Sequence, residues 1–188
     1  MLVILDRGHG QKPDGFDPGA ISGSLREVDI VADYLAHAAG VLTAAGHDVR
    51  YLDSGGYDAR HRQALAWAAE VKGPALYVQC HVNAGGGGYG LVEYDRRSTW
   101  GSTAAMCLAD ALTRAAKLGS ARTNPLDAGQ RGWVCIDDIY ASPTMCGLIF
   151  EPGFIDAPAH ASLWTPAGRV RVGDALADGI MAYAATRA

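Results

Sequence analysis

The 188-residue sequence contains no apolar run as long as the roughly 20 residues that a membrane-spanning helix needs. Its first residues also lack the basic start and the long apolar stretch of a secretory signal peptide. Lysine and arginine form no block, and the formal net charge is -4, so binding to nucleic acid through bulk charge is excluded. We therefore expect a protein that is made without a signal peptide, does not insert into a membrane and does not bind nucleic acid.

Cysteine is scarce and scattered, and the sequence has no CxxC pair. Hydrophobic residues make up 49% of the chain, so the single cysteines are typical of small buried side chains in a reducing compartment. A disulfide between two of them is the less favoured alternative. The four are Cys80, Cys107, Cys135 and Cys146, and the alternative pair is Cys135–Cys146.

No internal repeat or Pro/Ser-rich linker divides the chain, so residues 1–188 are predicted to form a single domain without an attached binding domain. Apolar runs predict buried strands, and apolar residues at helical spacing predict helices. Their alternation indicates an α/β fold, a three-layer sandwich whose mostly parallel, twisted sheet is flanked by helices. Strands are predicted at 2–6, 47–52, 75–80, 90–94, 133–136 and 147–151, and helices from 25 to a stop at Gly46, at 58–71 with Asp58 as N-cap, at 103–118 and at 169–186.

Three polar side chains stand at the ends of predicted strands. His9 follows the first strand, His81 follows the third, and Glu151 ends the last. Functional sites in such sheets gather at the carboxyl ends of the strands, so these residues are expected to converge. Two histidines and a glutamate would suit zinc, which keeps one position open for water in hydrolytic sites. Gly8 and Gly10 would let the backbone turn so that His9 faces the metal.

Each of these residues also has a purely structural interpretation. His9 could be a simple loop histidine, and His81 could be a buried histidine with its hydrogen bonds satisfied. Ser24 and Glu27 have the spacing of a helix capping box, which by itself favours a cap rather than a ligand. Glu151 is the hardest to explain structurally, because an ionisable group at the end of a buried strand needs a partner or a function.

Taken together, the motifs resemble the Amidase_3 family of N-acetylmuramoyl-L-alanine amidases, which occur in bacterial autolysins and phage endolysins. The resemblance covers nearly the whole chain, and the motifs occur in the family's order. They are Ile4-Leu-Asp-Arg-Gly-His-Gly10 with Asp17-Pro-Gly-Ala20, Glu27 in the following helix, His81-Val-Asn-Ala84, and Glu151-Pro-Gly-Phe-Ile155.

The resemblance implies a zinc enzyme that hydrolyses the amide bond between N-acetylmuramic acid and L-alanine of the peptidoglycan stem peptide. It implies one Zn²⁺ per chain, held by His9, Glu27 and His81. The role of Glu27 as a zinc ligand then replaces the helix cap that its spacing from Ser24 favoured. One side chain could also serve both roles. Glu151 would be the catalytic carboxylate. We expect it to take a proton from the attacking water and to return it to the leaving alanine amine.

Other residues of the motifs suggest supporting roles. Asp6 is expected to orient a ligand, and Asn83 to anchor the substrate or a loop. Arg131 and Gly132 resemble an Arg-Gly pair that recurs in the family ahead of the last two strands. Arg131 either contacts the substrate or packs and supports its loop, and the second interpretation is favoured. The chain departs from the family at a few positions that remove no ligand, and residues 95–129, which match poorly, are where substrate preference is expected. The departures are Arg7 for Pro, Gln11 for Gly, and Gln79-Cys80 for a Ser-aliphatic pair.

Peptidoglycan is the expected partner, and a monomer is expected. A phage endolysin that is made in the cytoplasm and reaches the cell wall through a holin-type pore fits these features. A secreted autolysin domain whose signal was removed would look the same.

Three alternatives differ in testable ways. A zinc carboxypeptidase or endopeptidase that acts on the stem peptide would be expected to have a His-x-x-Glu pair, and His9 and Glu27 are too far apart for one. A catalytically silent wall-binding module would have no need for an open metal site. Dinucleotide binding is dismissed, because Pro13 occupies the place of the third glycine of that fingerprint.

Overall fold

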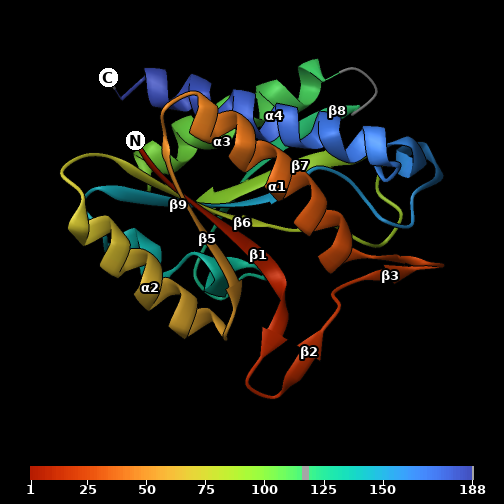
Figure 1. Ribbon diagram of the computed structural model, residues 1–188, viewed down its shortest axis with the longest axis horizontal. Coiled ribbons are helices and arrows are strands. Elements are labelled where there is room, and N and C mark those ends of the chain that lie inside the picture. Colours follow the sequence, from red (N-terminus) through yellow and green to blue (C-terminus); the bar gives the residue numbers. More distant parts are fainter. Residues whose placement is uncertain (116–118, 188) are drawn as a thin grey trace.

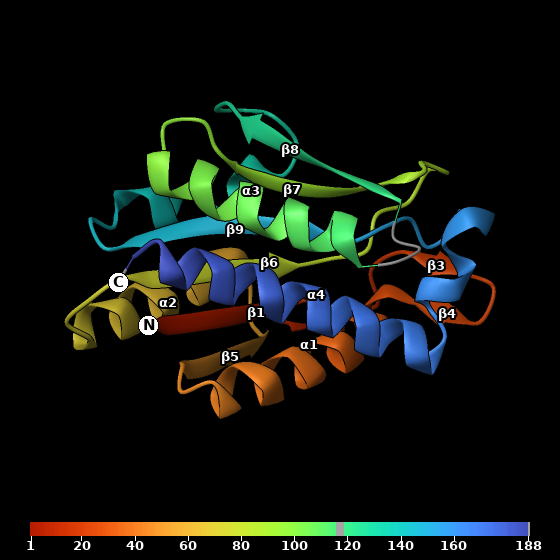
Figure 2. The same cartoon turned by 90° about the horizontal axis from the view of Figure 1, so that it is seen from above.

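A mixed seven-stranded sheet forms the centre of the protein. The computed structural model describes residues 1–115 and 119–187. Four strands run parallel, in the order β5 (Asp48–Ser54), β1 (Leu2–Lys12), β6 (Ala75–Cys80) and β9 (Met145–Glu151). Beyond β9 the sheet continues with β7 (Tyr89–Asp95), antiparallel to β9, and β8 (Ser120–Leu126), parallel to β7 (Figure 2). The seventh strand, β2 (Gly15–Asp17), pairs antiparallel with the end of β1, and β3 (Ile21–Ser22) with β4 (Leu25–Arg26) forms a separate small hairpin.

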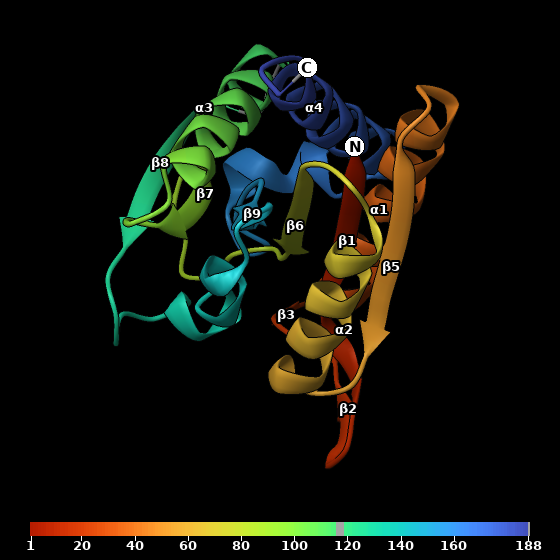
Figure 3. The same cartoon turned by 90° about the vertical axis from the view of Figure 1, so that its left-hand side faces the viewer.

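Helices cover both faces of this sheet, as Figure 3 shows. The helices α1 (Glu27–Ala44), α3 (Thr99–Arg114) and α4 (Pro166–Ala185) pack together on one face. The other face carries α2 (Tyr57–Glu70) and the short 3-10 helices η1 (Trp133–Cys135) and η2 (Asp138–Ala141), while η3 (Pro158–Leu163) leads into α4. The predicted three-layer α/β sandwich is therefore confirmed.

Alternation along the central strands divides the core into two halves. Val3 and Leu5 of β1 face the α1, α3 and α4 layer, whereas Leu2 and Ile4 face the α2 layer. Every residue of β6 is buried, because this strand has neighbours on both edges and helices on both faces. This explains why β1 and β6 appear in the sequence as continuous apolar runs.

The first strand is longer than predicted. Its pairing with β6 is regular as far as Arg7, whereas its pairing with β5 shifts register after Asp6. Residues Gly10–Lys12 then pair with β2, and the chain reverses at Pro13 and Asp14, residue types that favour turns. The resulting hairpin extends beyond the sheet (Figure 1). His9 thus lies within β1 rather than in a loop after it.

One strand prediction was wrong, and one long strand was not predicted. Residues 133–136 form the 3-10 helix η1 rather than a strand, because Gly132 before it adopts a left-handed conformation with φ 88° and turns the chain. The strand β8 was missed, since its sequence Ser-Ala-Arg-Thr-Asn-Pro-Leu is polar and contains a proline. Both features are typical of an edge strand, and β8 pairs only with β7.

Helix starts also differ from the predictions. The N-cap of α1 is Arg26, and Ser24 lies in the turn between β3 and β4, so the capping box does not form. Helix α2 begins at Tyr57 after Gly56, so Asp58 is not its cap. Helix α3 begins at Thr99, earlier than predicted, where Ser98 caps it, and the predicted end at 116–118 lies outside the described residues.

Two further findings concern the helices and the cysteines. Among the described residues, none of the helices combines the length and the apolar character needed to cross a membrane. All four cysteines are free thiols, so the alternative disulfide does not form.

Candidate metal centre

Glycines next to His9 allow β1 to bring that histidine close to His81. Gly10 has φ 121°, a conformation that side chains rarely adopt. A Cβ atom added to Gly8 would lie 2.2 Å from Cε1 of the His81 ring, so residue 8 must lack a side chain. Gly10 therefore has the conformational role that the sequence indicated, whereas Gly8 gives room for the His81 ring.

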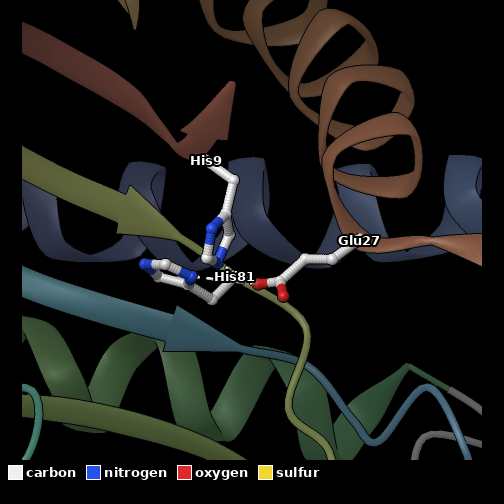
Figure 4. A group of neighbouring side chains, drawn as sticks. All are labelled: His9, Glu27 and His81. Carbon is white, nitrogen blue, oxygen red and sulfur yellow. Dashed lines mark hydrogen bonds and ion pairs between the residues drawn. The ribbon is translucent and has the colours of Figure 1, made fainter. Parts of the chain in front are cut away.

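The side chains of His9, Glu27 and His81 meet at one point, as Figure 4 shows. Glu27 Oε1 lies 3.2 Å from Nε2 of His9 and 2.9 Å from Nδ1 of His81. The two imidazole rings are perpendicular, with centroids 4.9 Å apart. Each of the three residues offers one ligand atom, and these atoms lie within 4.8 Å of one another. The three residues could hold a metal ion.

The Glu27 side chain is fixed by the backbone around it. Its Oε1 accepts a hydrogen bond from the Val82 N–H, and its Oε2 accepts one from the Ala20 N–H. A Cβ added to Gly19 would lie 2.6 Å from Glu27 Oε2. The carboxylate therefore points into the centre and does not cap its own helix.

Electrostatics at this point favour a bound cation. Burial by itself raises the pKa of Glu27, but hydrogen bonds and charges from His81 and His9 lower it well below its usual range. Burial lowers the pKa of His9, yet the carboxylates of Glu27 and Asp17 raise it overall. A buried, ionised carboxylate between two imidazoles is the donor set expected for a metal such as zinc.

Asp17 orients the ring of His9 from the outer side. Its Oδ2 lies 2.8 Å from His9 Nδ1, so a proton on Nδ1 leaves the lone pair of Nε2 directed at Glu27 and the centre. Asp17 is itself held by Lys12, whose Nζ is 2.5 Å from Oδ2, and by the Gly19 N–H. The sequence analysis placed Asp17 in a motif but assigned it no role.

Asp6 contributes indirectly. It is fully buried and accepts hydrogen bonds from Arg60 and Tyr77. Arg60 in turn donates to the carbonyl oxygens of Arg7 and Gly8, the two residues before His9. Asp6 makes no hydrogen bond to a candidate ligand among the described residues, so its support passes through Arg60 to the backbone.

Glu151 ends β9 beside the metal centre and is held by Asn83. The Asn83 Nδ2 donates to Glu151 Oε2 at 2.5 Å. Burial and the nearby carboxylates of Glu93 and Glu27 raise the pKa of Glu151 to about 7, against the opposing effects of Arg131 and Asn83. A carboxyl with this pKa can both accept and release a proton near neutral pH.

The three candidate ligands, Asn83 and Glu151 line one cleft of about 780 Å³. Arg131 is exposed at its wall rather than packed in its loop, in contrast to the favoured interpretation. Glu93, which the sequence analysis did not single out, also lines the cleft. A charged residue inside an otherwise apolar strand was the signal that could have identified it.

Comparison of the sequence with protein-family models identifies the family of the chain. The Amidase_3 model, described as N-acetylmuramoyl-L-alanine amidase, matches residues 3–182. The chain belongs to this family. The amidase therefore hydrolyses peptidoglycan, and the resemblance inferred from its motifs is confirmed. A search of curated proteins found no match to the amidase.

Solved structures share the fold of this amidase. The CwlD amidase from Clostridioides difficile, solved in complex with the GerS lipoprotein, has a TM-score of 0.77 at 19% identity, with 98% of both chains covered. The amidase AmiC2 of Nostoc punctiforme has a TM-score of 0.75 at 19% identity, with 98% of this chain and 97% of that chain covered. The catalytic domain of the CD27L endolysin, which targets Clostridia difficile, has a TM-score of 0.70 at 17% identity, with 97% of each chain covered.

Proposed function

We propose that this amidase holds one Zn²⁺ through His9 Nε2, Glu27 Oε1 and His81 Nδ1, and that Glu151 moves the protons of the reaction. The observation that carries the proposal is the position of Glu27 Oε1, within 3.2 Å of both imidazoles in the cleft that also contains Glu151. Three protein ligands of this kind are typical of catalytic zinc, which keeps a further position open.

Zinc, when bound there, would supply a Lewis acid that polarises the scissile carbonyl group and makes a water molecule more acidic. The residues of the chain supply the rest. Asp17 holds His9 in the tautomer that directs Nε2 inward, and the N–H groups of Ala20 and Val82 fix Glu27. These contacts preorganise the ligand atoms before the substrate arrives.

Glu151 has two successive tasks in this proposal. It first accepts a proton from the attacking water, and it then donates that proton to the alanine nitrogen, which must be protonated before it can leave. The pKa of about 7 suits both tasks. Asn83 holds Oε2 of Glu151, and Oε1 has no hydrogen-bond partner among the described residues, which leaves it available for the proton.

The proposal is tested by digesting purified peptidoglycan with the protein, with and without a chelator, and analysing the fragments by mass spectrometry. Stem peptides with a free L-alanine amine are expected, and they should disappear on chelation and return with added zinc. Cuts within the stem peptide would instead assign the protein to the endopeptidases or carboxypeptidases. Cleavage that survives complete zinc removal, shown by elemental analysis, would contradict the metal assignment.

A further inference from the structure

The cleft continues past Glu151 across the face of the sheet. In the register of β7 and β9, Leu91 lies opposite Glu151 and Glu93 lies opposite Ile149. These four residues line the cleft, so their side chains share one face of the sheet. Neighbouring β8 adds Asn124, whose Nδ2 donates to Glu93 Oε1 at 2.7 Å. The floor of this part of the cleft is therefore a polar pair set among apolar side chains.

The segment before η1 forms the wall opposite this floor. A Cβ added to Gly132 would lie 3.1 Å from Glu93 Oε2 and 3.2 Å from Ile149 Cδ1, so the segment rests directly on β7 and β9. Its neighbour Arg131 is exposed and lines the cleft beside Gly132.

Arg131 is the single lysine or arginine among the described residues that line the cleft, which also contains three glutamates. It makes no ion pair with any described residue. Other arginines do form ion pairs with carboxylates, as Arg60 does with Asp6. An exposed guanidinium without a partner can form a bidentate contact with a carboxylate. The cleft thus has one built-in site for an anionic group of a substrate.

The position of Glu151 decides which part of the substrate reaches this site. Glu151 must contact the alanine nitrogen to protonate it, so the stem peptide begins beside Glu151. His9 and its hairpin lie on β1, two strands away from β9, whereas Glu93 and Arg131 lie on the β7 side. A stem peptide that begins beside Glu151 and runs away from His9 would extend over β7 and β8, and the glycan would extend toward His9.

We propose that Arg131 binds a free carboxylate of the stem peptide, while Glu93 and Asn124 on the floor of the cleft contact the peptide's own N–H and carbonyl groups. This inference rests on the proposed amidase reaction. It assigns Arg131 a role in substrate choice, which distinguishes acidic stem peptides from amidated ones. Arg131 is then a residue that binds the substrate.

Two soluble muropeptides test the proposal. They are identical except that the second stem residue, a γ-linked glutamate, has a free α-carboxylate in one and a carboxamide in the other. The wild-type zinc enzyme is expected to prefer the carboxylate substrate. Arg131→Gln should lower kcat/KM for that substrate by about tenfold or more, mainly through KM, and should leave the carboxamide substrate nearly unchanged. Arg131→Lys should restore part of the preference, because it restores the charge without the bidentate geometry.

The matched control is Arg62→Gln, which removes an exposed arginine on α2 that does not line the cleft and should change neither substrate. An equal loss on both substrates in Arg131→Gln would overturn the proposal and indicate a structural role. A loss on both substrates that disappears at pH values above the acidic limb of the profile would instead assign Arg131 to the protonation of Glu151. Wild-type cleavage of both substrates without preference would overturn the carboxylate site alone, whereas cleavage of neither would overturn the amidase reaction as well.

Discussion

Asn83 donates a hydrogen bond of 2.5 Å from Nδ2 to Oε2 of Glu151, which joins the segment after β6 to the end of β9. The backbone of Asn83 is held as well, because its N–H donates to the Gly153 carbonyl and its carbonyl accepts from the Ile155 N–H. The loops after the two strands are thus tied together, and the carboxyl of Glu151 is held in one orientation in the cleft that the candidate metal ligands also line. The predictions below concern the groups that depend on this arrangement.

Glu151→Gln should retain zinc and lose most activity. Glutamine keeps the size of the side chain but cannot move a proton, a function that contributes about a hundred- to ten-thousand-fold in rate. The measurements are the rate of stem-peptide release and the zinc content by elemental analysis. Glu70→Gln, which changes an exposed glutamate on α2, is the control and should be fully active. Full activity in Glu151→Gln would exclude Glu151 as the proton carrier.

Asp17→Asn should weaken zinc binding by about 10- to 100-fold, because the carboxylate no longer fixes the tautomer and orientation of His9. Activity should recover at saturating zinc, since Glu151 is untouched. Competition with a chelator measures the affinity. Asp14→Asn, an exposed change in the turn of the same hairpin, should leave the affinity at the wild-type value. Equal affinities in the two variants would refute the role of Asp17.

The pH profile of kcat/KM should have an acidic limb with its midpoint at about 7 or below. Glu151 must be deprotonated to act as a base, so activity falls as pH drops below its pKa. Glu93→Gln removes a negative charge that raises this pKa, and the limb should therefore move to lower pH. Steady-state kinetics from about pH 5 to 9 in both proteins measure the shift. A limb that stays in place or moves to higher pH would contradict the coupling.

Gly8→Ala should displace His81 and reduce zinc content and thermal stability together. The added Cβ would lie 2.2 Å from the imidazole, a distance at which the ring must move. Gly40→Ala in α1 is the matched control, because no atom outside the local helix lies within 4 Å of its new Cβ. Alanine there should stabilise the helix by about 0.5–1 kcal/mol and preserve zinc binding. Thermal unfolding with and without chelator compares the two variants, and an intact zinc site in Gly8→Ala would show that the close contact is not required.

Much of the fold could be predicted from local patterns. The apolar runs of β1 and β6 reflect burial on both faces, and the spacing in α1 and α4 reflects one buried side. The apolar pattern did not predict the correct element in segments that are only partly buried. The edge strand β8 is too polar to show a strand pattern, and η1 has the apolar residues of a strand but follows a left-handed glycine.

The sequence by itself determined the order of the motifs and the expectation that His9, His81 and Glu151 converge, because the carboxyl ends of parallel strands share one edge of a sheet. Only the tertiary structure decided the orientation of Glu27, whose spacing from Ser24 fits a cap equally well. Only the folded chain also showed that Asp17 contacts His9 and that Arg131 and Glu93 line the same cleft. Local patterns record burial and turn preference, whereas these contacts depend on the distance and direction between segments far apart in the chain.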